Sequence, residues 1–374
     1  MVTGRDPWVY NFSPDALMQN VQKCMDTYNA DLKRFNAHFR EAFKQRTKGV
    51  KSADLYKHLN DREITTDKTK IAWGQNLKMQ LIKGKKLDDF SQEKISVSFY
   101  RPFNKQYFYY ERELSWSFYL MKKIFPDKDA QNVVINTGVG NGKNFSALVS
   151  DAIPDTHFIG IIGNAKAYPL YYYDDLGNRH YAISGYALNL FRKHYKDNSI
   201  AEEEIFYYIY AILHHKGYLE KYKNSLTKED PRIALSEDFK ELSALGKELA
   251  KLHLNYESGE MHASVEYNLL ENAEIEGYYD VETMTKKGDR IIYNKNIAIT
   301  KIPKKAFDYV VNGKSAIDWV IERYKKTTDK DSLIENNPND YAGGKYVFEL
   351  LCRVIKLSEK SVDLIEKISK KRFE

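Results

Sequence analysis

Hydrophobic residues in the N-terminal stretch recur at three- and four-residue steps, the spacing of one face of a helix. The pattern predicts a helix over 14–48, with Ser13 as its N-cap and Pro14 at its first position. Residues 47–70 are polar and charged, which indicates a loop or a helical excursion. A short amphipathic segment is predicted at 73–82.

The period changes at Lys94, where apolar and polar residues begin to alternate as they do in a half-buried strand. Residues 101–105 have the composition of a turn and 106–112 form an aromatic strand, so a β-hairpin is predicted over 95–112. Gly, Asn and Pro then separate short apolar segments. Further strands are predicted at 133–136, 147–150, 157–162 and 168–173.

Helical spacing returns beyond residue 200, with one interruption by a predicted hairpin at 291–299. Helices are predicted at 202–214, 239–254, 303–325 and 345–370. The predicted fold class is therefore α+β, a sheet-rich central lobe flanked by N-terminal and C-terminal helical segments. A length of 374 residues suggests two or three domains. We expect a helical coupling segment at 1–93, a mixed, β-rich lobe at 94–200 and a mostly helical region at 201–374.

The bulk composition is that of a globular protein, with 43% hydrophobic and 29% charged residues. No stretch approaches the roughly 18 apolar residues of a membrane span, and the N-terminus lacks the layout of a signal peptide. Only Cys24 and Cys352 are present, which excludes a disulfide framework or a cysteine-rich zinc site. We expect a cytoplasmic protein with no membrane partner.

Positive charge is concentrated in the first 150 residues. Residues 1–90 contain 17 Lys and Arg against 11 Asp and Glu, residues 91–150 contain 8 against 5, and the remainder is net acidic. A phosphate backbone would be attracted to that part of the chain, although an ordinary solvated basic surface has a similar excess. The 29 Tyr fit either a Tyr-rich core and surface or an interface for nucleic acid or protein.

Most catalytic signatures are incomplete. The glycine-rich stretch 137–143 lacks the Lys-Ser/Thr ending of a phosphate loop, so we interpret it as a loop that needs positive φ or close backbone approach. Asp155 with Asn164 and Lys166 resembles a metal-dependent nuclease motif, but Asn164 is a poor ligand where a second acid is needed. The adjacent His214 and His215 would point about 100° apart on a helix and could not share a metal.

Several segments are familiar when they occur together and in this order. They are 4–12 (GRDPWVYNF), 100–103 (YRPF), 124–126 (IFP), 145–148 (FSAL), 153–155 (IPD), 168–173 (YPLYYY), 204–208 (EIFYY), 252–257 (LHLNYE), 309–316 (YVVNGKSA), 327–332 (TTDKDS) and 337–340 (NPND). As an ordered set, the series resembles the C-terminal specificity region of type ISP restriction–modification enzymes, and the resemblance covers nearly the whole chain.

The resemblance implies a target-recognition domain that reads double-stranded DNA and positions an adenine for an adjoining N6-adenine methyltransferase. Family members look like a nuclease, a helicase, a methyltransferase and this domain on one polypeptide. The chain begins where the methyltransferase would be ending, so it resembles a fragment with no complete active site. S-adenosylmethionine, ATP and Mg are expected for the upstream domains, no cofactor for this chain, and the upstream methyltransferase and helicase are expected partners.

If the lobe at 94–200 reads DNA, it must contact both phosphates and base edges. The candidate DNA-binding residues are Arg101, Lys105, Arg112, Lys122, Lys123, Asn141, Lys143, Asn144 and Lys166. Each of them could instead be a surface residue, and Arg101 could stack on an aromatic ring or pair with Glu111. Tyr107, Tyr109 and Tyr110 could stack on bases, but a place in the sheet core is favoured.

Two other function classes stay open. The chain could be a docking and coupling module between the methyltransferase and helicase parts, with little sequence reading of its own. The basic region 1–150 weighs against this interpretation, and the Tyr-rich helices weigh for it. A residual hydrolase is a weaker alternative, because the catalytic motifs in the sequence are incomplete.

Overall fold

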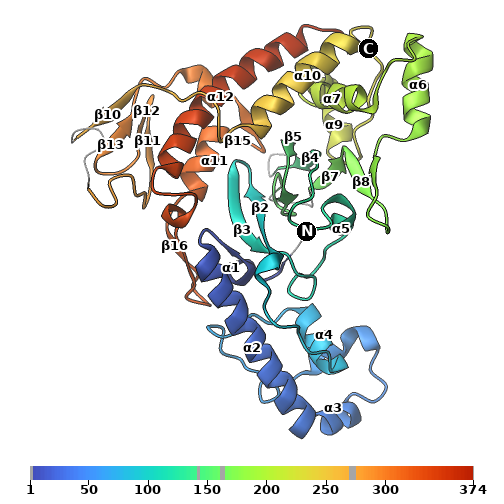
Figure 1. The fold of residues 1–374 in the computed structure, drawn as a ribbon, viewed down its shortest axis with the longest axis vertical. Coiled ribbons are helices and arrows are strands. Elements are labelled where there is room, and N and C mark those ends of the chain that lie inside the picture. Colours follow the sequence, from blue (N-terminus) through green and yellow to red (C-terminus); the bar gives the residue numbers. More distant parts are fainter. Residues whose placement is uncertain (1–2, 141–143, 161–164, 269–274, 374) are drawn as a thin grey trace. The chain divides into compact units, whose positions relative to one another are not determined.

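The computed structural model describes residues 3–140, 144–160, 165–268 and 275–373. Helices and several small sheets are mixed along the chain, which confirms the predicted α+β class (Figure 1). The chain forms two compact units, each assembled from separate stretches of sequence. Unit 1 comprises 1–98, 106–120 and 326–341, and unit 2 comprises 99–105, 121–325 and 342–374. The domain boundaries expected at 94 and 201 stay a prediction.

The long helix of unit 1 is α2, Pro14–His38, and its predicted start is confirmed. The Ser13 hydroxyl accepts a hydrogen bond from the Ala16 backbone N–H, and Pro14 occupies the first turn. The helix does not continue to residue 48, because Phe39 leaves helical geometry with φ −120°. A second helix, α3 (Arg40–Arg46), follows.

The rest of unit 1 packs beside α2. The polar stretch 47–70 contains only a 3₁₀ segment, η1 (Ser52–His58), and the predicted amphipathic segment is α4 (Gln75–Lys83). Gly84 ends α4 in the left-handed conformation, a common role of glycine. The remaining elements of unit 1 are α1 (Asp6–Val9), β1 (Tyr10–Asn11), η2 (Gln92–Lys94), β16 (Thr327–Thr328), β17 (Glu335–Asn336) and η4 (Pro338–Asp340).

The predicted hairpin over 95–112 is confirmed as β2 (Ile95–Arg101) and β3 (Asn104–Tyr109). Phe103 turns the chain between the two strands with φ +56°. The base of the hairpin belongs to unit 1, where β3 pairs with β1, and the tip at 99–105 belongs to unit 2. In unit 2 the tip is tied to β6 (Ile153–Pro154), since the Asp155 N–H donates to the Phe99 carbonyl.

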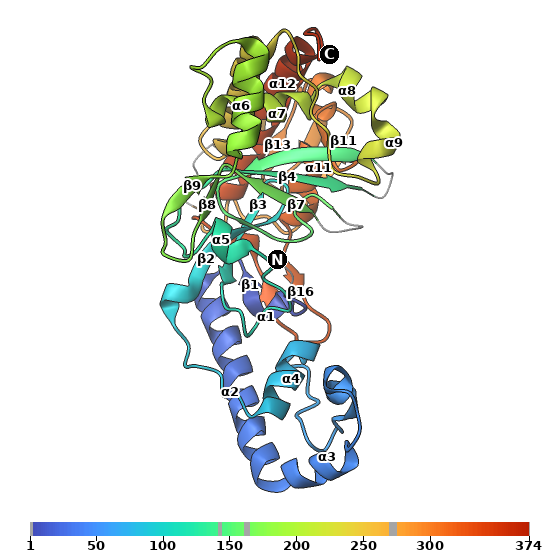
Figure 2. The ribbon, with the colours of Figure 1, turned by 90° about the vertical axis from the view of Figure 1, so that its right-hand side faces the viewer.

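Unit 2 contains a three-stranded antiparallel sheet in the order β5-β4-β7 (Figure 2). Its strands are β4 (Val134–Val139), β5 (Phe145–Ser150) and β7 (Lys166–Pro169). The predicted strand 168–173 is interrupted at Leu170, after which β8 (Tyr171–Tyr173) pairs with β9 (Arg179–Tyr181). The strand predicted at 157–162 is wrong over 157–160, which turns and bends after β6, and 161–162 lie outside the described residues.

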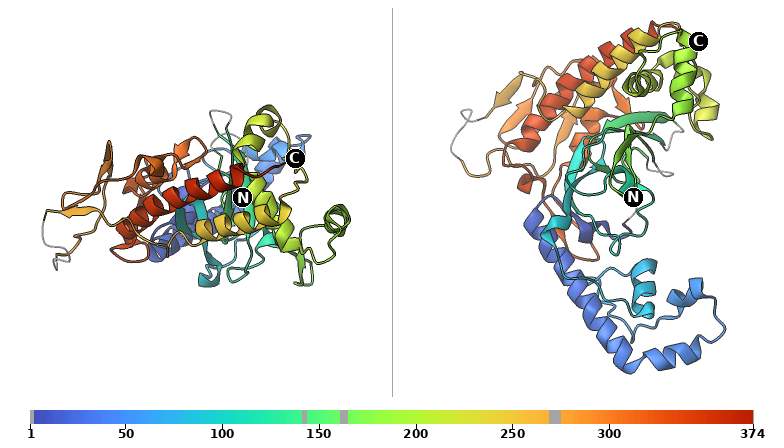
Figure 3. Two further views of the ribbon diagram at one scale, coloured as in Figure 1. Left: turned by 90° about the horizontal axis from the view of Figure 1, so that it is seen from above. Right: turned by 45° about the vertical axis from the view of Figure 1, so that its right-hand side comes forward.

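Helices cover one face of this sheet. The predicted helices 202–214, 239–254 and 345–370 are confirmed as α7 (Glu202–Ile212), α10 (Phe239–Leu254) and α12 (Tyr346–Ser369). Both views in Figure 3 show α10 and α12 running side by side. A Cβ at Gly246 of α10 would lie 2.0 Å from the Tyr207 carbonyl oxygen, so glycine allows α10 to approach α7 closely.

The helix predicted over 303–325 is wrong in its first half. That segment contains η3 (Lys304–Phe307) and a hairpin of β14 (Val310–Val311) and β15 (Lys314–Ser315), and only α11 (Ala316–Arg323) is helical. Asn312 and Gly313 form the two-residue turn with φ +52° and +79°, the values that a type I′ turn requires. The prediction was wrong there because the apolar residues of a tight hairpin followed by a helix can have the same spacing as those of a single long helix.

The remaining elements of unit 2 include the predicted hairpin 291–299, which is confirmed as β12 and β13. These two strands belong to a four-stranded sheet in the order β10-β13-β12-β11. The bounds of the elements of unit 2 not given above are α5 (Met121–Ile124), α6 (Gly185–Tyr195), α8 (Lys216–Lys221), α9 (Lys223–Leu226), β10 (Val265–Tyr267), β11 (Thr285–Lys287), β12 (Arg290–Ile292) and β13 (Ile297–Ile299). No helix among the described residues has the length and apolar character needed to cross a membrane.

Candidate nucleic-acid interface

Arg101 at the tip of the β2–β3 hairpin is mostly buried. Its guanidinium donates to the Asp155 carboxylate at 2.9 Å, and the two side chains are 12% and 2% exposed. The guanidinium also lies over the Tyr100 ring, 3.8 Å from its centroid. The aromatic partner expected for Arg101 is therefore present, but its carboxylate partner is Asp155 and not Glu111.

Asp155 is held as a carboxylate. Burial raises the pKa of this group, but hydrogen bonds from His157 and the charge of Arg101 outweigh burial, so its pKa lies below the usual value. Asp155 also accepts the His157 backbone N–H at 2.9 Å. These partners occupy the carboxylate that the nuclease-like motif would have used to hold a metal ion.

Lys105, on the other side of the hairpin tip, also has carboxylate partners. Its ammonium lies 2.5 Å from Glu257 and 3.8 Å from Asp151, and it sits over the rings of Phe99 and Tyr256. The side chain is as little exposed as that of Arg101. Both cations of the tip therefore fix the hairpin within unit 2, and neither presents a free charge at the surface.

The glycine-rich stretch approaches the β14–β15 turn closely. A Cβ at Gly140 would lie 1.8 Å from the Asn312 side-chain oxygen, so only glycine fits there. The Asn312 backbone N–H donates to the Ser146 hydroxyl at 2.8 Å. Close backbone approach, one of the two reasons expected for these glycines, is confirmed at Gly140.

Two predicted residues share one end of the β5-β4-β7 sheet. Asn144 is exposed, and its carbonyl accepts the Gly140 N–H. Lys166 pairs with Thr137 in the neighbouring strand, and its exposed ammonium forms an ion pair with Asp230. The predicted residues Asn141 and Lys143 lie outside the described residues.

Lys122 and Lys123 lie at the opposite end of the same sheet. Both are exposed on the short helix α5, which packs against β8. Lys122 donates to the Pro126 carbonyl at 3.1 Å, and Lys123 lies 3.5 Å from Asp175. The register of β4 separates the two ends by five residues, about 17 Å. Arg112 is also exposed but belongs to unit 1. The described residues of the predicted set are therefore divided between the two units, and within unit 2 they are spread over the hairpin tip and both ends of the sheet.

The sequence placed β8 within a strand predicted at 168–173, but β9 and α6, with their exposed side chains, were missed. Tyr172 stacks on His180 with ring centroids 5.2 Å apart, and both are exposed on the β8–β9 hairpin. Tyr186 at the start of α6 is 80% exposed. The signals in the sequence were Ser184 as an N-cap, the three- and four-residue spacing of Leu188, Phe191 and Tyr195, and a long run without acidic residues.

The adjacent histidines do not form a metal site. His214 is buried and shares a hydrogen bond with the Tyr210 carbonyl, while His215 accepts the Tyr218 N–H and so caps α8. Burial lowers the pKa of His214 to about 4 and that of His253 well below its ordinary value. Among the described residues, no group of three His, Cys, Asp or Glu side chains is placed to hold a metal.

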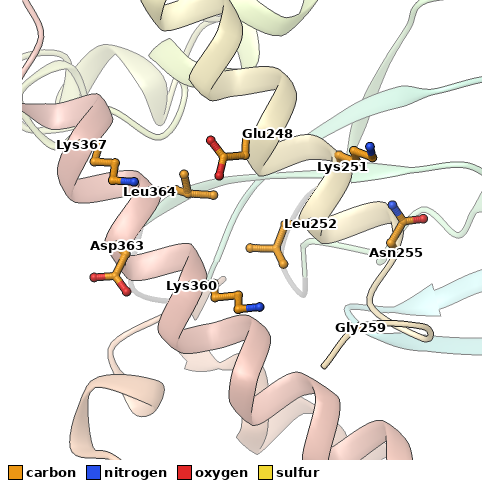
Figure 4. A pocket seen from close by; sticks show the side chains of 9 residues that line it. All are labelled: Glu248, Lys251, Leu252, Asn255, Gly259, Lys360, Asp363, Leu364 and Lys367. Carbon is orange, nitrogen blue, oxygen red and sulfur yellow. The ribbon is translucent and has the colours of Figure 1, made fainter. Parts of the chain in front are cut away.

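A hollow of about 460 Å³ lies between α10 and α12. Leu252 and Leu364 stand between the two helices, and charged side chains surround them (Figure 4). Among the nine residues that line the hollow there is no Ser, Cys or His that could act as a nucleophile or general base.

The match to a family model decides where this domain belongs. The model of the type ISP C-terminal specificity domain matches residues 1–350. The chain belongs to this family. The ordered segments that suggested the resemblance are distributed over both units, so the family assignment applies to the whole assembly of hairpin, sheet and helices. No curated protein matches the chain.

Solved structures show the same fold at full length of this domain. A nuclease-deletion mutant of the type ISP restriction–modification enzyme LlaGI, in complex with a DNA substrate mimic, is 34% identical with a TM-score of 0.82. The ATP-dependent type ISP enzyme LlaBIII bound to DNA is 30% identical with a TM-score of 0.82, and a DrdV–DNA complex is 28% identical with a TM-score of 0.79. The matches cover 100%, 100% and 98% of this specificity domain but 28%, 23% and 35% of those chains.

Proposed function

We propose that this specificity domain reads sequence in double-stranded DNA for a type ISP restriction–modification enzyme. The observation that carries the proposal is family membership combined with full-length likeness to domains of DNA-bound enzymes. The finer proposal is that the domain positions a target adenine for an adjoining N6-adenine methyltransferase. An adenine must leave the base stack before its amino group can react, so a neighbouring domain has to hold the duplex in register.

The candidate residues fall into two roles within this proposal. Arg112, Lys122, Lys123 and Lys166 are exposed, and they are proposed to contact phosphates. The ion pair of Lys166 with Asp230 is exposed too, so exchanging it for a phosphate contact costs less than about 1 kcal/mol. Asn144 is proposed to contact the DNA, and the same contact is proposed for Asn141 and Lys143, which lie outside the described residues.

Arg101 and Lys105 have a different part in the proposal. Their carboxylate partners hold the hairpin tip in place. Burial and, to a smaller extent, repulsion from the positive charge of Arg101 lower the pKa of Arg323. Both residues therefore support the DNA-reading surface through the position of the tip. Any direct DNA contact would require the ion pairs to open.

The activities of the complete polypeptide remain proposals for the parts outside this chain. Methylation would use S-adenosylmethionine, and DNA translocation and cleavage would use ATP and Mg. In this proposal S-adenosylmethionine, ATP and Mg bind to the parts of the polypeptide outside this chain. The domain would contribute sequence discrimination, while the upstream methyltransferase and helicase would perform the chemistry.

The phosphate-contact proposal is tested by paired substitutions of equal charge. Lys122→Ala with Lys123→Ala should weaken duplex binding and reduce the slope of log affinity against log salt by about two, because two phosphate contacts are lost. The matched control is Lys287→Ala with Lys295→Ala, two exposed lysines that lie on β11 and in the turn between β12 and β13. Equal slopes for the two pairs would contradict the assignment of Lys122 and Lys123.

A docking role is the second candidate, and an exposed apolar cluster in unit 1 favours it. Trp116, Tyr119 and Leu120 are 60%, 63% and 68% exposed. Gly4 lies beside this cluster, because a Cβ at Gly4 would be 3.5 Å from the Trp116 ring. Clusters of this kind mark protein interfaces, and we assign this one to the methyltransferase part that the family places before this domain.

The rate of amide hydrogen exchange tests whether the apolar cluster is covered by a docked domain or exposed to solvent. In the full-length enzyme, the backbone amides of 114–121 should exchange more slowly than in the 374-residue chain, because a docked domain covers them. The tip around Leu176, exposed in unit 2, serves as the control and should exchange alike in both proteins. Equal exchange of 114–121 in the two proteins would remove the docking candidate at this surface.

A further inference from the structure

The segment 176–196, which contains β9 and α6, has an unusual charge pattern. It contains Arg179, Arg192, Lys193 and Lys196 and no Asp or Glu, although 52 of the 374 residues of the chain are acidic. The segment lies in the half of the chain that is net acidic overall. Asp174 and Asp175 precede the segment and Asp197 follows it, and His180 within the segment is paired with Asp174. The four cations between these acids are complementary to a phosphate backbone.

Helix α6 presents one open face. Tyr186, Asn189, Leu190 and Lys193 follow one another at three- and four-residue spacing, so they share this face, and all are exposed. None of the side chains of Tyr186, Asn189 and Lys193 has a hydrogen-bond or ion-pair partner within the described ranges. Phe191 anchors the opposite face in the core of unit 2. Figures 1 and 3 show α6 at the edge of unit 2.

Helix α6 is capped at both ends and is held to the rest of unit 2 by side-chain hydrogen bonds. The Ser184 hydroxyl accepts the Ala187 N–H at 3.2 Å, and Lys196 ends the helix in the left-handed conformation. The Arg192 side chain donates to the Ile200 carbonyl at 2.9 Å, and the Tyr195 hydroxyl donates to the Ser236 carbonyl at 2.7 Å. The open face is therefore carried on a fixed support, as base reading requires.

We propose that α6 enters the major groove of the bound duplex and reads base edges with Asn189. This inference rests on the proposed DNA-reading function and names an element that carries it. The major groove is about 12 Å wide and admits a helix, and the 11 residues of α6 span about 16 Å, or about five base pairs. The Asn189 amide can form two hydrogen bonds with the edge of an adenine. Tyr186 would supply an aromatic contact to the bases, and Lys193 would contact a phosphate of the backbone.

Selection of bound duplexes from a randomised pool tests the base-reading role. The 374-residue chain should enrich a consensus, and Asn189→Ala should relax one position of that consensus, with about tenfold or greater loss of discrimination there. Lys193→Ala should weaken binding to all sequences alike. Asn224→Ala, an exposed asparagine on α9, is the matched control and should leave the consensus unchanged.

A tethered cleavage reagent tests the placement. Cys24 and Cys352 are both buried, so a cysteine introduced by Leu190→Cys is the accessible thiol for an iron chelate. Cleavage of the bound duplex should occur at one place with the strand offset of the major groove. Ala244→Cys, on the exposed side of α10, is the control and should give weaker cleavage or none.

The outcomes separate the two levels of the proposal. A consensus that is enriched by the chain and unchanged by Asn189→Ala, with no cleavage from Leu190→Cys, overturns the role of α6 and leaves DNA reading intact. Absence of any salt-dependent duplex binding by the unaltered chain overturns DNA reading itself. Cleavage with the strand offset of the minor groove overturns the major-groove placement.

Discussion

Arg101 and Asp155 form a nearly buried ion pair, and such pairs are costly to break from one side. Arg101→Ala removes the positive charge and leaves the Asp155 carboxylate buried without its partner. We expect the free energy of unfolding to fall by about 3 kcal/mol, measured by urea denaturation. Lys166→Ala breaks an exposed pair and should cost less than about 1 kcal/mol. Equal losses for the two variants would contradict the structural role of the hairpin-tip pair.

The buried histidines make stability depend on pH. The pKa of His214 is about 4 in the folded chain and near 6.5 when unfolded, so between these values the unfolded chain binds the extra proton. The free energy of unfolding should therefore fall as pH drops from about 6.5 to 4, by about 3 kcal/mol for His214 alone. His253 adds to the effect in the same direction.

Denaturation at a series of pH values measures this slope. His194→Gln removes an exposed histidine and is the control that should leave the slope as it is. The paired carboxylates of low pKa, such as Asp174, lose most of their stabilising contribution below the window, as pH falls from the unfolded pKa near 4 towards their lowered folded pKa. A flat profile between pH 6.5 and 4 would show that His214 and His253 accept protons in the folded chain.

At the scale of elements, the glycine-rich loop is adapted to its neighbour. Gly140→Ala would place a methyl group on the Asn312 side chain, and we expect a loss of about 2 kcal/mol in unfolding free energy. Combining it with Asn312→Gly should recover part of the loss, because glycine removes the clashing atoms and tolerates the φ of +52° at that turn. Gly185→Ala in α6 meets nothing within 4 Å and should be neutral or slightly stabilising.

The elements also show what the sequence can predict. Leucine spacing placed α10 over its full length, and Ser13 with Pro14 placed the start of α2, because both signals are local. The helix predicted over 303–325 was wrong because Asn312 and Gly313 specify a tight turn within an apolar spacing of about 3.6. For the site, the exposure of Lys166 agrees with its charge, whereas the carboxylates that hold Arg101 and Lys105 come from residues 155 and 257, and no local pattern reports such long-range partners.

At the scale of the molecule, the central claim is that the chain reads duplex DNA. It predicts binding that weakens steeply with salt, because lysine and arginine contacts release counterions from the phosphates. The most direct measurement is the affinity of the 374-residue chain for its selected duplex and for an unrelated duplex from 50 to 200 mM salt. We expect a linear fall of log affinity with log salt for both and tighter binding to the selected duplex throughout. Equal affinity for the two duplexes at every salt concentration would contradict the claim.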